Sequence, residues 1–266
     1  IRNSKIKTKL VLLFIILSLI PLTITGYYAY YESSNATKDK ISTYSVQVMA
    51  QIGENIDREL AKLEYDSIEI QFSDKVQNTL LNIDTMTPFD IYDAQNQMQD
   101  ELVKKFSFLH DVSDVLLYTN GMEKIIAYGD KTFTLKLKKA FLDNFLEDVI
   151  EKKGVAVWAA INEDDEERFV EYATSTELMN RNNGVLIGRA IRSLMHGDMI
   201  IGSLIIRTNE RFFTNIYRNI DIGLGSDIFV MDINGIVVSS RNPEIPVAKK
   251  YSDKNFIEEI KRNSAN

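Results

Sequence analysis

The feature that most constrains this chain is a run of 22 residues without a charged side chain, Leu10 to Tyr31. At about 1.5 Å of rise per residue, a helix of this length reaches across a hydrocarbon core of roughly 30 Å. A single segment crosses a bilayer only as a helix, because lipid offers no partners to free backbone N–H and C=O groups. The run therefore predicts a transmembrane helix over residues 10–31.

The residues that flank this run predict its orientation. Four cations precede it and four tyrosines close it: Arg2, Lys5, Lys7 and Lys9, then Tyr27, Tyr28, Tyr30 and Tyr31. A basic flank favours the cytoplasmic side, and tyrosines suit the opposite interface. A cleaved signal peptide would be shorter and end in small residues, and a buried core helix would not be apolar all round beside a basic cluster. We therefore expect a retained anchor in the cell membrane, with 1–9 cytoplasmic and the chain after Glu32 extracytoplasmic.

Composition narrows the function of the outer part. The chain has 31 basic and 38 acidic residues, so the part beyond the four leading cations carries 27 against 38, a net charge of −11. Such a surface disfavours nucleic acid and binding to anionic lipid beyond the anchor itself. The chain has no cysteine, which excludes disulfides, thiolate metal sites and thiol catalysis. A chain of this size buries enough surface to fold without disulfides.

A long helix is predicted directly after the membrane run. No proline occurs from Ser33 to Thr87 before Pro88, and apolar residues recur at steps of three, four or seven: Ile41, Val48, Ile52, Ile56, Leu60 and Leu63. This stripe is one face of a helix, which we place as a stalk over 32–87. It either packs on its own domain or forms the seam of a homodimer. Residues 91–109 are predicted to form a second helix.

Two segments of the outer part are similar to each other. Residues 113–121 and 226–235 both begin with Ser-Asp, continue through β-branched and aromatic residues, and end at Asn-Gly before another apolar run. Asn-Gly between strand formers predicts a hairpin, since both residues tolerate positive φ. The copies lie 113 residues apart, about the size of a small domain. They suggest a duplicated α+β module.

The segments between and after the copies complete the predicted order of elements. Helices are expected over 135–152, stopped by Gly154, and over 210–219 and 253–262. Strands are expected over 155–161, 169–173, 184–194 and 199–207, with a hairpin at 196–198. Each module would then be α+β, with a largely antiparallel sheet of about five strands.

This organisation resembles the double Cache sensors, which are tandem PAS-like extracytoplasmic domains, and within them the YesM-type bacterial sensor histidine kinases. The matching pieces are residues 6–10, 189–191, 201–206 and 226–240. The resemblance implies a membrane-distal module over 88–219 and a membrane-proximal module that begins at 220 and is incomplete at 266. It implies a ligand-sensing region that passes a signal across the membrane to a kinase, although no phospho-acceptor or ATP-binding motif lies in this chain.

Two alternatives to this function stay open. One is the sensor domain of a methyl-accepting chemotaxis receptor. The other is a membrane-anchored surface interaction or enzyme domain without cytoplasmic output. The partners expected for a sensor are a small molecule, such as a sugar or a carboxylate, or an extracellular binding protein. No cofactor, metal or catalytic residue is predicted.

Four residues are candidate ligand contacts: Trp158, Arg189, Tyr118 and Tyr172. Cache domains that bind amino acids typically present Arg-x-Trp-Tyr, whereas Trp158 has Ala156 two residues before it and Ala159 after it. Trp158 can stack on a ligand or pack in a core. Arg189 can bind a carboxylate or phosphate, or form a salt bridge.

Metal sites are not expected from the sequence. His110 and His196 are isolated, and the acidic run 163–167 is typical of a solvated loop. Asp232-x-Asn234-Gly235 is similar to the start of a calcium loop, but Arg241 occupies the position of the required glutamate.

Overall fold

The computed structural model contains a long N-terminal helix, several shorter helices and two antiparallel sheets. It describes residues 6–106, 111–129, 137–162, 184–223 and 226–264. Contacts within the chain define two compact units, residues 1–53 and 54–266. The predicted strand 169–173, the acidic run 163–167 and the residues Tyr172 and His110 lie outside the described residues.

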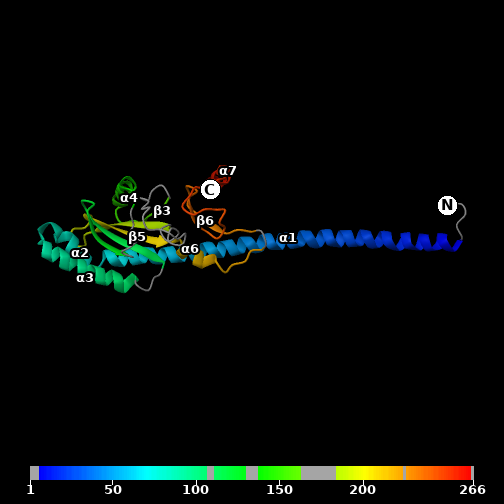
Figure 1. Ribbon diagram of the computed structural model, residues 1–266, viewed down its shortest axis with the longest axis horizontal. Coiled ribbons are helices and arrows are strands. Elements are labelled where there is room, and N and C mark those ends of the chain that lie inside the picture. Colours follow the sequence, from blue (N-terminus) through cyan, green and yellow to red (C-terminus); the bar gives the residue numbers. More distant parts are fainter. Residues whose placement is uncertain (1–5, 107–110, 130–136, 163–183, 224–225, 265–266) are drawn as a thin grey trace. The chain divides into compact units, whose positions relative to one another are not determined.

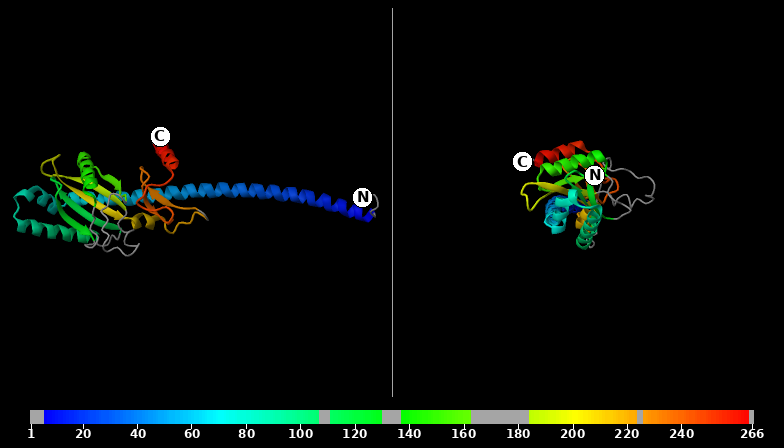
Figure 2. Two further views of the ribbon diagram at one scale, coloured as in Figure 1. Left: turned by 45° about the horizontal axis from the view of Figure 1, so that its top comes forward. Right: turned by 90° about the vertical axis from the view of Figure 1, so that its left-hand side faces the viewer.

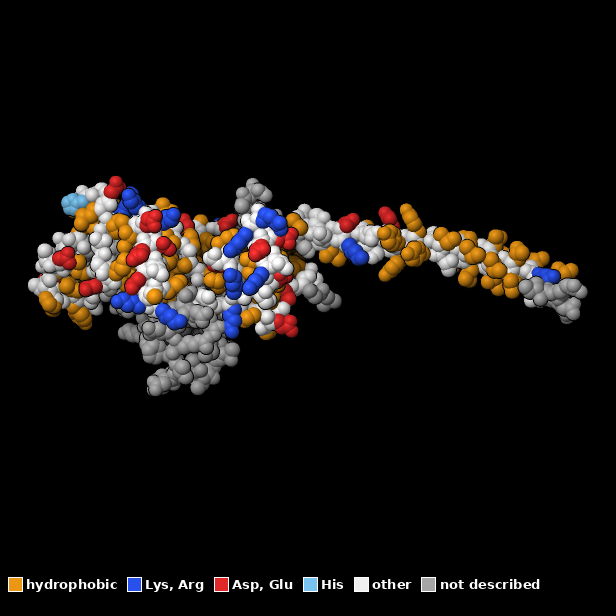
Figure 3. Space-filling model, turned by 90° about the horizontal axis from the view of Figure 1, so that it is seen from above, with side chains coloured by type: hydrophobic (Ala, Val, Ile, Leu, Met, Phe, Trp, Pro, Cys, Tyr) orange, Lys and Arg blue, Asp and Glu red, His pale blue; other side chains and the backbone are white. Residues whose placement is uncertain are grey.

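Helix α1 (Ile6–Gln71) begins with the apolar run found in the sequence. This part of the helix is long and apolar enough to cross a membrane, and none of its side chains is buried. Figure 3 shows the apolar side chains along its visible face. Pro21 stands inside the helix, where nearby threonine hydroxyls donate to backbone carbonyls, as Thr25 does to Pro21 at 2.7 Å. Such bonds help an apolar helix to tolerate proline.

The stalk helix ends earlier than the sequence predicted. Ser73 is extended and separates α1 from α2 (Asp74–Asn82), which a short 3-10 turn, η1 (Ile83–Thr85), follows. The Gln77 side chain donates to the carbonyl of Gln71 at 2.7 Å and so satisfies one terminal acceptor of α1. Helix α3 (Pro88–Phe106) begins at a reciprocal cap between Thr87 and Asp90. Pro88 therefore stands at the first position of α3, where proline is favoured because its missing N–H would have no partner in the helix.

The central sheet has five antiparallel strands in the order β2-β1-β5-β4-β3. Their bounds are β1 Val112–Thr119, β2 Lys124–Gly129, β3 Val157–Ala160, β4 Gly184–Arg192 and β5 Ile200–Asn209. Helix α4 (Lys139–Glu151) covers one face of the sheet, and α2 and α3 lie on the other (Figure 1). The views in Figure 2 agree with this layering. The predicted α+β class with antiparallel sheets is confirmed.

A second, two-stranded sheet follows α6 (Glu210–Tyr217) and consists of β6 (Phe229–Met231) and β7 (Val237–Ser240). Helix α7 (Lys254–Ser264) comes last. The hairpins predicted at the two Asn-Gly pairs form, as does the one predicted at 196–198 between β4 and β5, but neither Asn-Gly pair makes a two-residue turn. Met122 takes the left-handed conformation in the first connection and Gly235 in the second, with φ of 60° and 86°. Longer connections need only one such residue, so Asn120 and Asn234 keep negative φ.

One hydrophobic core lies between the sheet and α4. Ten buried side chains form it, with Leu116 and Tyr118 from β1, Phe145, Leu146 and Val149 from α4, and the remainder Leu137, Ile161, Leu186, Ala190 and Ile205. The central strand β5 is buried along most of its length, as is typical of an apolar strand covered on both faces. Asp114 and Arg207 form a buried ion pair between β1 and β5, in which Arg207 Nε donates to Asp114 Oδ2 at 2.7 Å.

Candidate functional site

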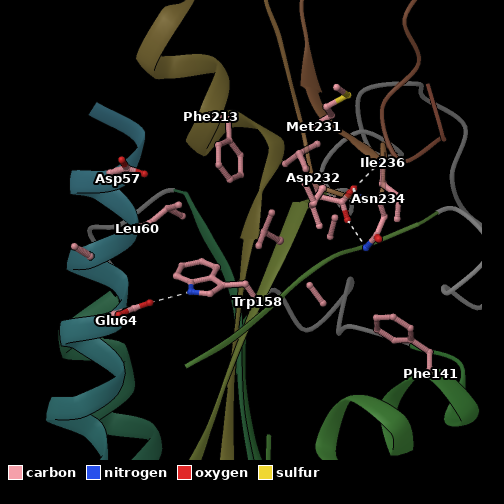
Figure 4. Close-up of a pocket in the computed structure, with 16 residues that line it drawn as sticks. Asp57, Leu60, Glu64, Phe141, Trp158, Phe213, Met231, Asp232, Asn234 and Ile236 are labelled. Atoms are coloured by element: carbon pink, nitrogen blue, oxygen red, sulfur yellow. Dashed lines mark hydrogen bonds between the residues drawn. The ribbon is translucent and has the colours of Figure 1, made fainter. Parts of the chain in front are cut away.

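A cavity of about 690 Å³ lies within the unit 54–266. Its wall comes from α1, β3, β4, the start of α4, α6 and the β6–β7 hairpin. Figure 4 shows that side chains from the α1 helix and from the hairpin approach it from opposite sides. Segments far apart in the sequence therefore meet at one cavity, which is typical of a ligand site.

Much of the cavity wall is apolar and aromatic. Three rings take part, Phe141 from α4, Trp158 from β3 and Phe213 from α6. Leu60 and Met231 add aliphatic surface from α1 and β6. This lining suits a small molecule with an apolar body, because such a body leaves water for a largely apolar wall.

Trp158 is fixed in this wall by a bond to α1. Strand β3 pairs with β4 so that Trp158 lies opposite Ile187. The indole Nε1 donates a hydrogen bond to Glu64 Oε1 at 2.9 Å (Figure 4). Trp158 thus presents ring surface to the cavity while its polar atom is satisfied, which holds the ring in one orientation.

The charged side chains that line the cavity are acidic. Asp57 and Glu64 stand seven residues apart on α1, and Asp232 begins the turn between β6 and β7. No Lys or Arg occurs among the described residues of the lining. Asp232 has a structural task, since its Oδ1 accepts from the backbone N–H groups of Asn234 and Ile236 at 2.9 and 2.7 Å. Asp57 and Glu64 leave their carboxylates on the wall of the cavity.

Arg189 lies behind Glu64, not in the large cavity. Its side chain is buried on β4, its Nε donates to Ser67 Oγ at 2.7 Å, and its Nη1 donates to the carbonyl of Gly154. Burial lowers the pKa of the guanidinium, while the charge of Glu64 acts in the opposite direction. Arg189 therefore ties α1 to the sheet, and it also lines a smaller cavity of about 290 Å³ beside Lys153 and Arg192.

The structure thus separates the four residues that the sequence singled out. Trp158 lines the large cavity and Arg189 supports it from behind. Tyr118 belongs to the core under α4, where burial raises its pKa to about 12. Tyr172 lies outside the described residues.

Asp57 and Glu64 were missed as site residues. The signal was present in the sequence, because Asp57, Leu60, Ala61 and Glu64 follow the i, i+3, i+4, i+7 spacing of one helix face. This face carries both acidic and apolar side chains, and it shares Leu60 with the apolar stripe that predicted a packing surface. Asp232 was considered only as part of a calcium loop, and the structure uses its carboxylate to hold the turn.

No metal centre accompanies this cavity in the described part of the chain. Nowhere among those residues do three or more His, Asp or Glu side chains come together in a way that could hold an ion. The carboxylates of the wall are instead spread over two elements.

Two solved structures with similar folds come from Vibrio signalling proteins. The sensor domain of the histidine kinase DctB from V. cholerae aligns with a TM-score of 0.54 and 12% identity, over 85% of this chain and 77% of that one. A domain of a sensory box/GGDEF family protein from Vibrio parahaemolyticus aligns with a TM-score of 0.53 and 9% identity, over 82% and 78%. This chain therefore shares its fold with these two domains.

A third structure is more distant. The sensory domain of the Campylobacter jejuni chemoreceptor Tlp3 with isoleucine bound aligns with a TM-score of 0.40 and 13% identity, over 79% of each chain. No protein-family model matches the sequence, and no curated protein matches it either.

Proposed function

We propose that this chain is the extracytoplasmic ligand-sensing region of a membrane receptor, and that the cavity beside Trp158 takes the ligand. The observation that carries the proposal is the cavity itself, because α1 supplies part of its wall and the same helix begins with the apolar run. The sensor-domain fold supports the same role.

A ligand in this cavity would contact α1 on one side and the β6–β7 hairpin on the other. Binding changes a receptor only when the ligand has different affinities for two of its states. A ligand that bridges two elements meets this condition, since any shift between them alters its contacts. We infer that the bond between Trp158 and Glu64 transmits the occupancy of the cavity to α1.

The finer assignment is a double Cache sensor of a YesM-type histidine kinase, with a distal module over 88–219 and a proximal module from 220. The resemblance at residues 6–10, 189–191, 201–206 and 226–240 favours it. We also propose a homodimer and retention in the membrane through 10–31. A chemoreceptor is the alternative of the same class, and the gene beyond the codon for Asn266 distinguishes the two. A second apolar span followed by a phospho-acceptor histidine supports the kinase, and a long cytoplasmic coiled coil rich in glutamate and alanine supports the chemoreceptor.

Ligand binding is tested on the full chain in an uncharged polyoxyethylene detergent. Calorimetry and thermal shift would be run with glucose, succinate, isoleucine, choline and putrescine, which cover sugars, carboxylates, amino acids and amines. We expect one class to bind and to raise the melting temperature, because a ligand that binds only the folded state stabilises it. Trp158→Ala should abolish the shift, and the exposed Phe89→Ala should retain it.

The variant Trp158→Phe separates loss of binding from loss of fold. It keeps a ring in the cavity and removes the donor to Glu64, so its ligand-free melting temperature should stay nearer that of the parent chain. If no class binds, or if binding persists unchanged in Trp158→Ala, the cavity is not the sensory site.

A further inference from the structure

We propose that the ligand of this cavity is a small organic cation that carries no carboxylate. This inference rests on the proposed function and makes it more specific. It differs from the sugar or carboxylate expected from the sequence, and it follows from the combination of rings and charges on the cavity wall.

The aromatic rings of the cavity wall favour a cation. Trp158, Phe141 and Phe213 line one cavity of about 690 Å³, which exceeds the needs of a single ion. The faces of aromatic rings carry negative electrostatic potential, and cations bind over them most strongly at tryptophan. The hydrogen bond to Glu64 already orients the ring of Trp158, so little conformational freedom is lost on binding.

The charges of the cavity wall favour a cation as well. Asp57, Glu64 and Asp232 give the described lining only negative charge. Asp57 is an exposed residue of the lining that forms neither a hydrogen bond nor an ion pair with any described residue, so its carboxylate is available to a cationic ligand. The nearby Arg189 acts on Glu64 from behind and does not reach the lining. A ligand carboxylate would meet repulsion here and find no described cation to pair with.

The arrangement also disfavours a metal ion as the occupant. Asp57 and Glu64 are separated by two helical turns, about 10 Å along the axis. Within the described ranges no three acidic or histidine side chains gather closely enough to coordinate an ion. Dispersed carboxylates among rings suit an ammonium group with an apolar or hydrocarbon body.

The test compares two ligands that share one head group. Choline and glycine betaine both carry a trimethylammonium group, and betaine adds a carboxylate. Calorimetry on the full chain in polyoxyethylene detergent should show choline or putrescine binding, and betaine binding at least about tenfold more weakly than choline because of repulsion by Asp57 and Glu64. The affinity for the cation should fall as salt is raised.

Isosteric variants assign the effect to the cavity. Asp57→Asn and Glu64→Gln should each weaken binding of the cation by about fivefold or more, since each removes one attractive charge. Glu64→Gln keeps an oxygen acceptor for the indole of Trp158, so the geometry of the wall is retained. Glu59→Gln is the matched control, because Glu59 is exposed on the same helix and does not line the cavity.

The outcomes separate this inference from the proposed function. If glucose, succinate or betaine binds more tightly than choline and putrescine, and Trp158→Ala abolishes that binding, the inference of a cationic ligand is wrong. The proposed sensor role then stands. Binding of choline or putrescine that both charge variants leave unchanged also overturns the inference. If none of these compounds binds, the inference and the sensory role of the cavity fall together.

Discussion

Arg189 shows how one buried side chain joins separate elements. It is 7% exposed, and its guanidinium donates to Ser67 on α1 and to the carbonyl of Gly154 after α4. Arg189→Met keeps the aliphatic stem but removes both donors. We expect a loss of about 1–3 kcal/mol in the free energy of unfolding, because buried acceptors lose their partners. Urea unfolding of the full chain measures it.

Arg192 provides the control for this prediction on the same strand. Its side chain is 46% exposed and pairs at 3.5 Å with Asp198, which is 96% exposed. Exposed ion pairs contribute little, so Arg192→Met should cost less than about 1 kcal/mol. Equal losses in the two variants would show that the contacts of Arg189 do not stabilise the fold.

The raised pKa of Glu210 predicts that the stability of the fold depends on pH. It stands in the first turn of α6, and its pKa is raised chiefly by burial, against the effects of the Thr214 hydroxyl, the Ser240 backbone and Arg211. The folded protein therefore holds this proton to higher pH than the unfolded chain does. The protonated carboxyl of Glu210 contributes its full stabilisation below the ordinary pKa of glutamate. This stabilisation is lost as the pH rises through the raised pKa of the folded state.

The variant Glu210→Gln isolates this contribution. We expect its free energy of unfolding, measured in urea between pH 4 and pH 8, to fall less steeply with rising pH than that of the parent chain. Glu258→Gln on α7 is the control, since Glu258 is exposed. A pH profile that stays the same in Glu210→Gln would contradict the linkage.

At the scale of elements, local pattern predicted most of what the structure contains. The helices at 88–106, 139–151 and 210–217 and the strands at 112–119, 184–192 and 200–209 all fall within a few residues of the segments predicted from periodicity and turn residues. The end of α1 could not be predicted, because no proline or glycine marks it. Ser73 breaks the helix where Gln77 and Glu101 provide side-chain partners from elsewhere in the fold.

Strand order and turn geometry also needed tertiary information. The strands β1 and β5 are neighbours, although β2, β3 and β4 lie between them in the sequence. The Asn-Gly pairs correctly marked both hairpins, but the number of residues in each connection depends on which residues pair in the flanking strands. Met122, not Asn120 or Gly121, consequently takes the positive φ in the first one.

Close packing between β4 and α4 makes a prediction at this scale. A Cβ at Gly188 would meet Val149 and would lie 2.8 Å from ring atoms of Phe145. Gly188→Ala should therefore destabilise the fold by about 1–3 kcal/mol through overpacking. Gly53→Ala on α1 should have the opposite sign and stabilise by about 0.5–1 kcal/mol, because its Cβ would meet nothing within 4 Å and alanine favours helix. Urea unfolding compares the pair, and two changes of the same sign would contradict it.

For the whole molecule, the candidate site could be predicted only in part. Trp158 was chosen for its chemistry, and it does line the cavity. Its acidic neighbours Asp57, Glu64 and Asp232 come from α1 and from the β6–β7 hairpin, and only folding brings these segments together. The sequence thus indicated a ring suited to ligand binding, but the sign of the charge around it is a property of the tertiary structure.

The residues that flank the apolar run predict the orientation of the chain in the membrane. The basic flank of the apolar run favours the cytoplasm, so residues 1–9 should lie inside and the unit 54–266 outside. Because the chain has no cysteine, a single introduced thiol reports its own position without background. Thr8 and Ser226 are suitable positions, since both are exposed and lie on opposite sides of the run.

Intact cells that express Thr8→Cys or Ser226→Cys would be treated with a membrane-impermeant maleimide. We expect labelling of Ser226→Cys in intact cells and of Thr8→Cys only after the membrane is permeabilised. The unmodified chain is the control and should stay unlabelled. The reverse pattern would invert the topology, and labelling of both thiols in intact cells would mean that 10–31 does not span the membrane. A cavity on the outer side can sense external solutes, so the expected pattern is also a condition for the proposed function.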